Sequence, residues 1–391
     1  LKQRQPEPNS RSASNAMDKP VVIIDNGSGH MKAGLAGSGK PSCVFPAVVG
    51  RPKHDSAMVG CDKRDYFMGD EALAKKGVLA LSFPLYHGIV RDWNDMEKIW
   101  HHTFFDALRV NPEEHAVIVT EAPMNPKKNR ERMIELLFEK FAVPAAYVVI
   151  QAVMSLYSYG RTTGCVVDSG DGVTHVVPVY EGYCLPHAIQ RLDLAGRDLS
   201  EYMVKILTEG GFVMQSSAEK EIVRDMKETC CYVCQDGFEE TLKNSQNKPT
   251  EYEKHYTMPD GQVVTLNSER FRVPEVLFDP MLSGRELPGI HTATFNCILA
   301  CEIDIRRDLY KNIVMSGGTT MFPGIRDRLE FEVKRLAPQK MKVDVQADKD
   351  RKYIVWMGAS VVAELTNFDR MVIWKSEYDE LGPSVVHRKC L

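Results

Sequence analysis

Apolar residues are arranged along this chain in two patterns, one typical of strands and one typical of helices. Short β-branched runs at Val21–Ile24, Val148–Ile150 and Val166–Val167 predict buried strands. Between these runs, apolar residues recur at helical spacing. After Asp92, which can cap a helix, one such stripe runs through Trp93, Met96, Trp100, Phe104 and Leu108. Strands that alternate with amphipathic helices predict an α/β fold.

Further helices are predicted downstream of this stripe. One opens at Asn125–Pro126, because proline is well tolerated in a first turn. Others begin near Leu199, Ala218 and Ile325. The polar stretch Lys243–Lys254 has no clear periodicity, so we expect a surface loop there.

Two short loops share one pattern. Asp25–Gly29 reads DNGSG and Asp168–Gly172 reads DSGDG, and each follows a predicted strand and precedes another. Glycines let backbone N–H groups approach an anionic ligand closely, whereas the leading aspartate suits a divalent cation. The loops lie 168 − 25 = 143 residues apart, which indicates a duplicated unit that holds one nucleotide from both sides. A third glycine-rich turn, Ser316–Thr320, fits the sugar and base.

Composition narrows the class of protein. The chain has 391 residues, 43% hydrophobic and 26% charged, which is long enough for two domains. Because its net charge is −4, we expect no nucleic-acid partner. No apolar stretch is long enough for a membrane span. The polar residues 1–16 predict a disordered extension or a cloning remnant.

The ten cysteines are scattered, which indicates a reducing cytoplasmic location and no disulfide scaffold. Cys231 and Cys234 form a CxxC pair within a cluster that begins at Cys230. No second CxxC or histidine pair stands at zinc-finger spacing, so structural cysteines are favoured over a zinc site.

Five segments of the chain are long enough and specific enough to indicate a family: DNGSG at Asp25, DMEKIWHH at Asp95, DSGDGVTH at Asp168, EIVRDMKE at Glu221 and MSGGTTMFPG at Met315. Through these segments the sequence resembles the actin family over residues 17–391. The resemblance implies two similar α/β lobes with ATP in the central cleft, a fold shared with sugar kinases and heat-shock ATPases. Fold by itself does not fix the function.

The resemblance also implies domain limits. The first lobe would contain residues 17–158 and 354–391, with a small subdomain at about 47–83. The second lobe would contain residues 159–353, with a small subdomain at about 195–285.

Site residues follow from the same resemblance. Asp25, Gln151 and Asp168 would hold the water shell of Mg²⁺ or Ca²⁺, in keeping with the preference of Mg²⁺ for few direct carboxylates. The phosphates would meet Ser28, the amides of Gly29 and His30, and Lys32 on one side, with Asp171 and the amides of Gly170 and Gly172 on the other. The sugar and base would lie between Arg224, Lys227, Glu228, Gly318, Thr319, Phe322 and Lys352. Without the resemblance, Lys32 and the face around Arg224 would read as solvated surface charge.

For catalysis, the resemblance implies that Gln151 and His175 position the attacking water. Glutamine cannot act as a base, so we expect positioning and not proton abstraction. The expected activity is slow hydrolysis of ATP to ADP and phosphate, coupled to polymerisation. A lone histidine such as His175 is more often structural than catalytic, so both roles stay open for it. The alternative functions are an actin-related scaffold subunit and a poorly polymerising regulatory protein.

The resemblance implies self-association into cytoskeletal filaments. The loop Lys53–Lys63 would contact a neighbouring subunit. A partner groove would be formed by Tyr157, Tyr183, Leu365 and Met371.

Departures from the family pattern modify these expectations. Ser38 and Gly39 replace a usual acidic pair, which predicts weak or no activation of myosin. Arg285 lies in the segment that would bridge filament strands, and its burial there would be costly unless the charge is paired. This arginine predicts poorer assembly.

Overall fold

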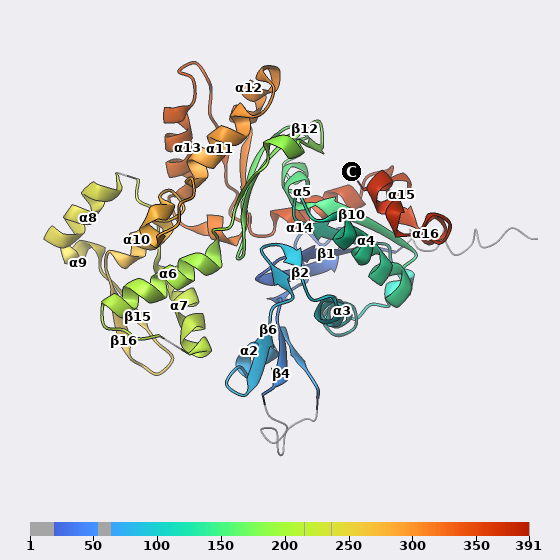
Figure 1. The fold of residues 1–391 in the computed structure, drawn as a ribbon, viewed down its shortest axis with the longest axis horizontal. Coiled ribbons are helices and arrows are strands. Elements are labelled where there is room, and N and C mark those ends of the chain that lie inside the picture. The colour runs from blue at the N-terminus through green and yellow to red at the C-terminus, as the bar shows by residue number, and fades with distance from the viewer. Residues whose placement is uncertain (1–18, 54–63, 215, 236, 391) are drawn as a thin grey trace, which may run out of the picture.

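Two six-stranded sheets organise the molecule, one in each half (Figure 1). This computed structural model describes residues 19–53, 64–214, 216–235 and 237–390. The predicted extension at 1–16 and residues 54–63 of the subunit-contact loop lie outside the described residues.

The first sheet has the strand order β19-β10-β9-β1-β2-β3. Strand β1 pairs antiparallel with β2 and parallel with β9, which in turn pairs parallel with β10. The strands are β1 (Val22–Asn26), β2 (His30–Leu35), β3 (Cys43–Pro46), β9 (Val117–Glu121), β10 (Ala145–Ile150) and β19 (Ile373–Trp374).

The second sheet repeats this scheme. Strand β11 pairs antiparallel with β12 and parallel with β17. The strands are β11 (Gly164–Ser169), β12 (Thr174–Tyr180), β13 (Tyr183–Cys184), β14 (Gln190–Leu192), β17 (Ile313–Ser316) and β18 (Val345–Gln346). In the first hairpin Asp25 stands opposite Lys32, and in the second Asp168 stands opposite His175. Both predicted strand–turn–strand units are therefore confirmed.

Helices cover both faces of the first sheet, as the burial of all of β1 requires. Figure 1 shows α3 on one side and α5 and α14 on the other. The helices of this half are α3 (Trp93–His101), α4 (Lys127–Glu135), α5 (Gln151–Tyr157), α14 (Ile354–Ala363), α15 (Phe368–Met371), α16 (Lys375–Leu381) and α17 (Val386–Lys389). Short 3₁₀ turns lie at Pro112–Glu114 and Pro383–Val385.

The predicted apolar stripe runs along α3 and continues into the π-helix that follows it. Asp92 caps this helix, since its side chain accepts from the backbone N–H groups of Asn94 and Asp95 at 3.0 Å each. Trp100 and Phe104 are fully buried. Beyond α3 the backbone widens into a π-helix at His102–Leu108, and α4 is likewise followed by a π-helix at Leu136–Lys140. The period of the sequence pattern did not distinguish this wider geometry from an α-helix.

The second half carries α11 (Ile290–Leu299), α12 (Ile303–Lys311) and α13 (Ile325–Leu336) beside its sheet, with 3₁₀ turns at Pro186–Ala188, Pro280–Ser283 and Gly318–Met321. Its outer part contains α6 (Gly196–Glu209), α7 (Ser217–Cys230), α8 (Phe238–Asn247), α9 (Pro249–Tyr252), α10 (Glu269–Glu275) and the hairpin of β15 (Lys254–Thr257) and β16 (Val263–Leu266). The predicted loop at Lys243–Lys254 is wrong, because α8 and α9 occupy it. These helices lie largely exposed at the edge, so they need few apolar residues.

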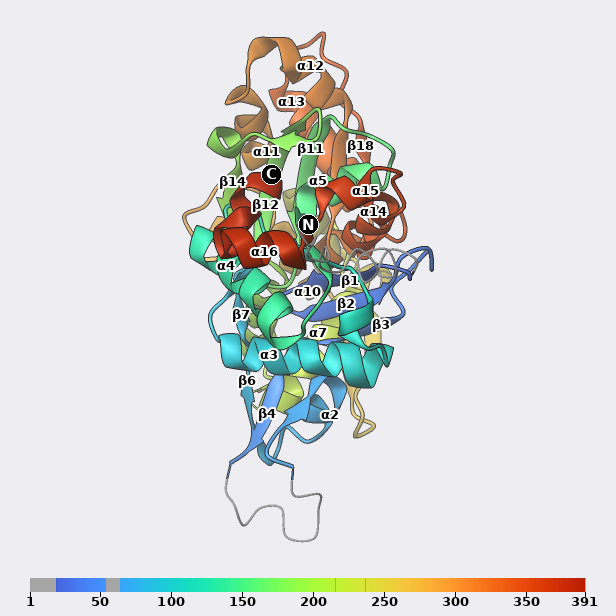
Figure 2. The same cartoon turned by 90° about the vertical axis from the view of Figure 1, so that its right-hand side faces the viewer.

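A three-stranded sheet extends from the first half (Figure 2). It consists of β4 (Val49–Pro52), β5 (Phe67–Met68) and β6 (Leu79–Ser82), with α2 (Gly69–Ala74) beside it. Val48, Phe67, Ala72 and Leu79 give it a separate small core. The hairpin of β7 (Leu85–Tyr86) and β8 (Ile89–Val90) leads from it back to α3.

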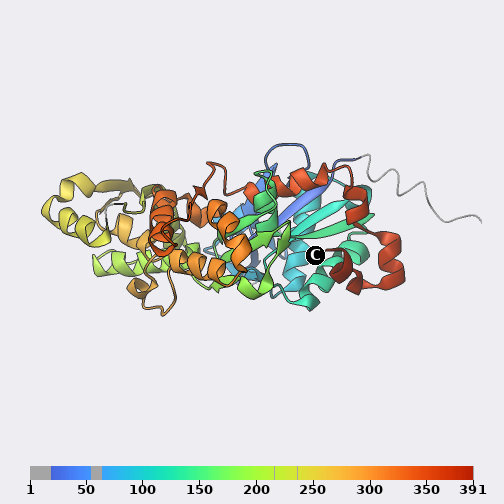
Figure 3. The same cartoon turned by 90° about the horizontal axis from the view of Figure 1, so that it is seen from above.

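Helices α5 and α14 cross in backbone contact between the two sheets. A Cβ added at Gly358 would lie 1.7 Å from the carbonyl oxygen of Met154, so only glycine fits there. Trp356, also on α14, donates its indole N–H to the carbonyl of Ile23 at 3.2 Å. Seen from above, the molecule is elongated, with α8 and α9 of the second half at one end and α16 of the first half at the other (Figure 3).

Candidate functional site

The two glycine-rich loops come from different sheets and nearly touch. A Cβ added at Gly29 would lie 2.7 Å from the Cβ of Asp171, and one added at Gly172 would lie 3.1 Å from the hydroxyl of Ser28. The β7–β8 turn braces both loops, since the N–H of Gly88 donates to Ser28 Oγ at 2.9 Å. His87, the first residue of this turn, bonds through Nδ1 to the carbonyl of Gly172.

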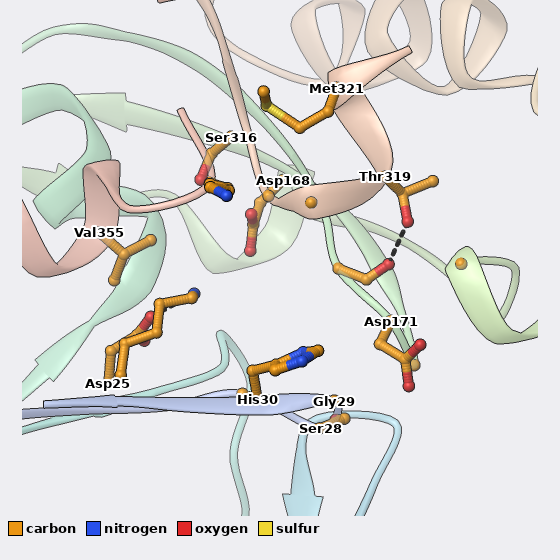
Figure 4. A pocket seen from close by; sticks show the side chains of 18 of the residues that line it. Asp25, Ser28, Gly29, His30, Asp168, Asp171, Ser316, Thr319, Met321 and Val355 are labelled. Carbon is orange, nitrogen blue, oxygen red and sulfur yellow. Dashed lines mark hydrogen bonds and ion pairs between the residues drawn. The ribbon is translucent and has the colours of Figure 1, made fainter. Parts of the chain in front are cut away.

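A cavity of about 410 Å³ lies beside the facing loops (Figure 4). All but one of the predicted site residues line it. They are Asp25, Ser28, Gly29, His30, Lys32, Gln151, Asp168, Gly170, Asp171, Gly172, Arg224, Lys227, Glu228, Gly318, Thr319, Phe322 and Lys352. The exception is His175.

Asp25 stands at the end of β1 and is buried. Lys32 Nζ lies 2.7 Å from one of its carboxylate oxygens, and Thr120 donates to the other at 2.7 Å. The side-chain nitrogen of Gln151 adds a third contact at 3.2 Å. Lys32 is therefore an ion-pair partner inside the cavity and not a solvated surface lysine.

Asp168 ends β11 on the opposite side of the cavity. Burial raises the pKa of its carboxyl, and the nearby negative charge of Asp25 acts in the same direction. A hydrogen bond with Ser316 and the charge of Lys32 act to lower the pKa. The negative charges of Asp25 and Asp168 therefore repel each other, and the positive charge of Lys32 attracts both carboxylates.

Gln151 is the first residue of α5, directly after β10. Its side-chain nitrogen faces Asp25 and also lies 3.1 Å from the carbonyl of Asn26. The amide group is held by the loop end of the first hairpin, so its orientation is fixed by hydrogen bonds. An amide can donate and accept but cannot remove a proton.

His175 lies on β12, opposite Asp168, and is buried outside the cavity lining. Burial, with a smaller contribution from the charge of Arg191, lowers the pKa of its imidazole to about 4, and the charge of Asp193 acts in the opposite direction. Its Nε2 has no hydrogen-bond partner among the described residues. A catalytic role for His175 therefore remains a hypothesis, and the ring does not reach the cavity in this arrangement.

Helix α7 supplies the charged wall at the far end of the cavity. Arg224 pairs with Glu228 one turn later at 3.1 Å. Lys227 is buried and donates to the carbonyl of Gly196 at 2.7 Å, and burial lowers the pKa of its amine. Lys227 is therefore not a solvated surface charge and Arg224 is largely buried, whereas the side chain of Glu228 is 57% exposed.

The third glycine-rich turn closes against the second loop. Thr319 donates to the carbonyl of Gly170 at 2.6 Å, the dashed contact in Figure 4. Gly317 has φ +93°, and a Cβ there would lie 2.2 Å from the carbonyl oxygen of Ser169. Only glycine allows this approach.

Sequence reasoning missed several lining residues. Asn26, Gly27, Val44, Gly88, Val173, Gly196, Ser316, Gly317, Met321, Tyr353 and Val355 also line the cavity. Gly27, Ser316 and Gly317 stand inside the glycine-rich turns, where the pattern pointed. The apolar residues gave no signal, because a cavity wall and a core position read alike in sequence.

An actin family model matches residues 16–391, nearly the whole chain. The chain belongs to the actin family. The predicted fold class is thereby confirmed, as two similar α/β lobes of the actin type. Members of this family generally bind a nucleotide with a divalent cation and are typically cytoskeletal.

The predicted partner groove has mixed support in this actin-family chain. Tyr183 is 62% exposed and Leu365 is 43% exposed, whereas Tyr157 and Met371 are half-buried. These side chains are at least partly accessible, but a partner for them stays a proposal. Within the described ranges, none of the helices combines the length and apolarity that a bilayer crossing requires.

Proposed function

We propose that this chain binds ATP with a divalent cation between its lobes, assembles into cytoskeletal filaments and hydrolyses ATP slowly upon assembly. One observation carries the proposal: two equivalent hairpin loops meet beside a cavity that is lined by all but one of the predicted site residues. A duplicated clamp of this kind suits a ligand with an anionic chain and a cation.

The residues present fit a divalent cation held mainly through water. Among the described residues, no three His, Cys, Asp or Glu side chains gather closely enough to hold a metal directly. Asp25 and Asp168 offer two carboxylates on opposite walls, and Gln151 adds an amide. Mg²⁺ commonly keeps several waters and uses one or two carboxylates. When bound, the cation would neutralise phosphate charge.

The chain's own groups would orient the reactants. The loop amides of Gly29 and Gly172 would hold phosphate oxygens, and Lys32 would add a positive charge. Gln151 would orient a water through its amide. Because glutamine cannot remove a proton from that water, slow turnover is the expected result.

The predicted lobe limits belong to this proposal. Helix α5 ends at Tyr157 and β11 begins at Gly164, whereas α14 begins at Ile354. These element ends support chain crossings near residues 158 and 353. The exposed side chains of Tyr183 and Leu365 support a surface for partners or for the next subunit. Weak or absent activation of myosin remains part of the proposal.

The test combines binding with assembly. A fluorescent ATP analogue should bind the purified protein, and EDTA should weaken that binding. Adding Mg²⁺ and salt should raise light scattering, with phosphate release following assembly. A protein that binds no adenine nucleotide would refute the proposal. Stimulation of turnover by sugars, without a rise in scattering, would indicate a kinase instead.

A further inference from the structure

His30 is the first residue of β2, and its side chain faces the cavity. Along this strand Met31 and Ala33 are fully buried in the core, whereas His30 and Lys32 line the cavity. Successive residues of a strand point to opposite faces, so His30 and Lys32 share one face. In Figure 4 the imidazole stands between Asp25 and Asp171.

The duplication supports this placement. Position 30 + 143 = 173 is Val173, which begins the corresponding part of the second hairpin and also lines the cavity. Both halves thus present this position to the cavity. Only the first half carries a polar ring there.

One contact fixes the hydrogen-bonding state of the ring. Arg224 Nη2 lies 3.2 Å from His30 Nδ1. A guanidinium can only donate, so Nδ1 accepts and the proton of the neutral ring sits on Nε2. Burial lowers the pKa of His30 to about 4, and the positive charges of Arg224 and Lys32 act in the same direction. The ring is therefore neutral at physiological pH.

The Nε2–H group of His30 is a donor that faces the cavity without a protein acceptor. No side chain or carbonyl among the described residues accepts from it. Two cations act on the ring, Arg224 at Nδ1 and Lys32 two residues along the same face, and the carboxylates of Asp171 and Glu228 act against them. A hydrogen bond to a charged oxygen is stronger than one to a neutral oxygen, so an anionic oxygen suits this donor better than a hydroxyl or a carbonyl.

We propose that His30 donates a hydrogen bond from Nε2 to an oxygen of the nucleotide phosphate nearest the sugar. This inference rests on the proposed nucleotide binding and adds a side-chain contact to the backbone contact expected at His30. The phosphate nearest the sugar is assigned because Arg224, the partner of Nδ1, belongs to the wall expected to meet the sugar. His30 is then a binding residue, whose Nδ1 accepts a hydrogen bond from Arg224 and whose Nε2 donates one to the ligand.

Three substitutions distinguish the role of Nδ1 from that of Nε2. His30→Gln keeps a donor near the position of Nε2, His30→Asn keeps a polar group near Nδ1 only, and His30→Leu removes both. Each is measured with ATP, ADP, AMP and adenosine as competitors of a fluorescent ATP analogue. His255→Leu is the matched control, because His255 is an exposed strand histidine outside the cavity.

We expect His30→Asn and His30→Leu to weaken binding of ATP, ADP and AMP by similar factors of about tenfold or more, the usual effect of losing a hydrogen bond to a charged group. His30→Gln should stay within about threefold of the unchanged protein. Adenosine binding should be the same in all variants, as it should be for His255→Leu.

Several results would overturn this assignment. Losses confined to ATP would place the contact at a terminal phosphate. Losses in His30→Gln and His30→Leu, with His30→Asn unchanged, would show that His30 acts only by positioning Arg224 through Nδ1. An unchanged affinity in His30→Leu would remove the contact altogether. If the unchanged protein binds no nucleotide, the proposed function fails, which is a result distinct from these three.

Discussion

The near-contact of the two loops makes Gly29 a direct test of lobe closure. Gly29→Ala adds one methyl group, whose carbon would lie 2.7 Å from Asp171 Cβ and 3.0 Å from Asp171 Cγ. Gly29 has no positive φ, so alanine fits its backbone without strain. The clash is therefore between the lobes and not within the first hairpin.

The size of the effect follows from these distances. Carbon atoms in good contact lie about 3.5–4.0 Å apart, so the loops must separate by roughly 1 Å. Overpacking of this kind typically costs about 1–3 kcal/mol. Because the clash exists only when the lobes are closed, it shifts the closed–open equilibrium by about 5- to 150-fold. Under the proposed function, release of a bound nucleotide should accelerate by a similar factor.

The assay is the rate at which a fluorescent ATP analogue leaves the protein when chased with unlabelled ATP. Gly172→Ala gives a graded comparison, because its Cβ would meet the Ser28 side chain at the milder distance of 3.1 Å. Gly77→Ala is the control, since a Cβ there meets nothing within 4 Å and the backbone has no positive φ. We expect the fastest release from Gly29→Ala, a slower release from Gly172→Ala and the slowest from Gly77→Ala.

Two results would refute this reasoning. Release from a folded Gly29→Ala protein at the rate of Gly77→Ala would show that the loops do not approach each other as described. A faster release from Gly172→Ala than from Gly29→Ala would contradict the distances. Circular dichroism and thermal unfolding would establish that each variant is folded.

Three further predictions concern stability and reactivity. Arg51→Ala should destabilise the protein by about 1–2 kcal/mol in urea unfolding, because it leaves the fully buried carboxylate of Asp95 with only Ser82 and the more distant Lys98 as partners, and adding Asp95→Asn should recover part of the loss. Burial acts to raise the pKa of Asp95, but the bonds from Arg51 prevail and lower it, so the pair stabilises above about pH 4 and the penalty should shrink as pH falls below that. Burial raises the pKa of Cys390 to about 12, so iodoacetamide at pH 8 should leave this thiol unmodified until urea unfolds the protein, as peptide mass mapping would show. Arg285 pairs with Asp198 at the start of α6, so Arg285→Ala should speed hydrogen exchange in the turn that contains it, and unchanged exchange would contradict this.

That last pair also answers an expectation from the sequence. Arg285 raised the question of an unpaired charge in the segment expected to bridge filament strands. In the structure its guanidinium also donates to the carbonyl of Asp193 at 2.6 Å, so the charge is paired within its own chain. The reach of an arginine across 92 residues of sequence cannot be read from a local pattern.

Short-range features were predictable and tertiary ones were not. The β-branched runs and glycine-rich turns identified both hairpins, because turn chemistry and strand preference act over a few residues. The stripe through Trp100 and Phe104 identified the buried face of α3 and of the π-helix that follows it. By contrast, the Lys243–Lys254 helices carry too little apolar character to stand out, and Met321 and Val355 line the cavity only because distant segments bring them there.

The two hairpins have equivalent backbones, related by an offset of 143 residues, but their side chains act differently in the cavity. The offset carries Asp25 to Asp168 and Lys32 to His175, and the strand registers place both pairs directly opposite each other. Equivalent register does not give equivalent reach. The flexible lysine extends to the carboxylate opposite it, whereas the shorter imidazole stays buried with its Nε2 unpaired among the described residues. The first hairpin therefore supplies its own positive charge to the cavity, and Asp168 depends on Ser316 and on Lys32 from the other lobe. Backbone duplication fixes the positions of the two walls, and side-chain length decides which of those positions act in the cavity.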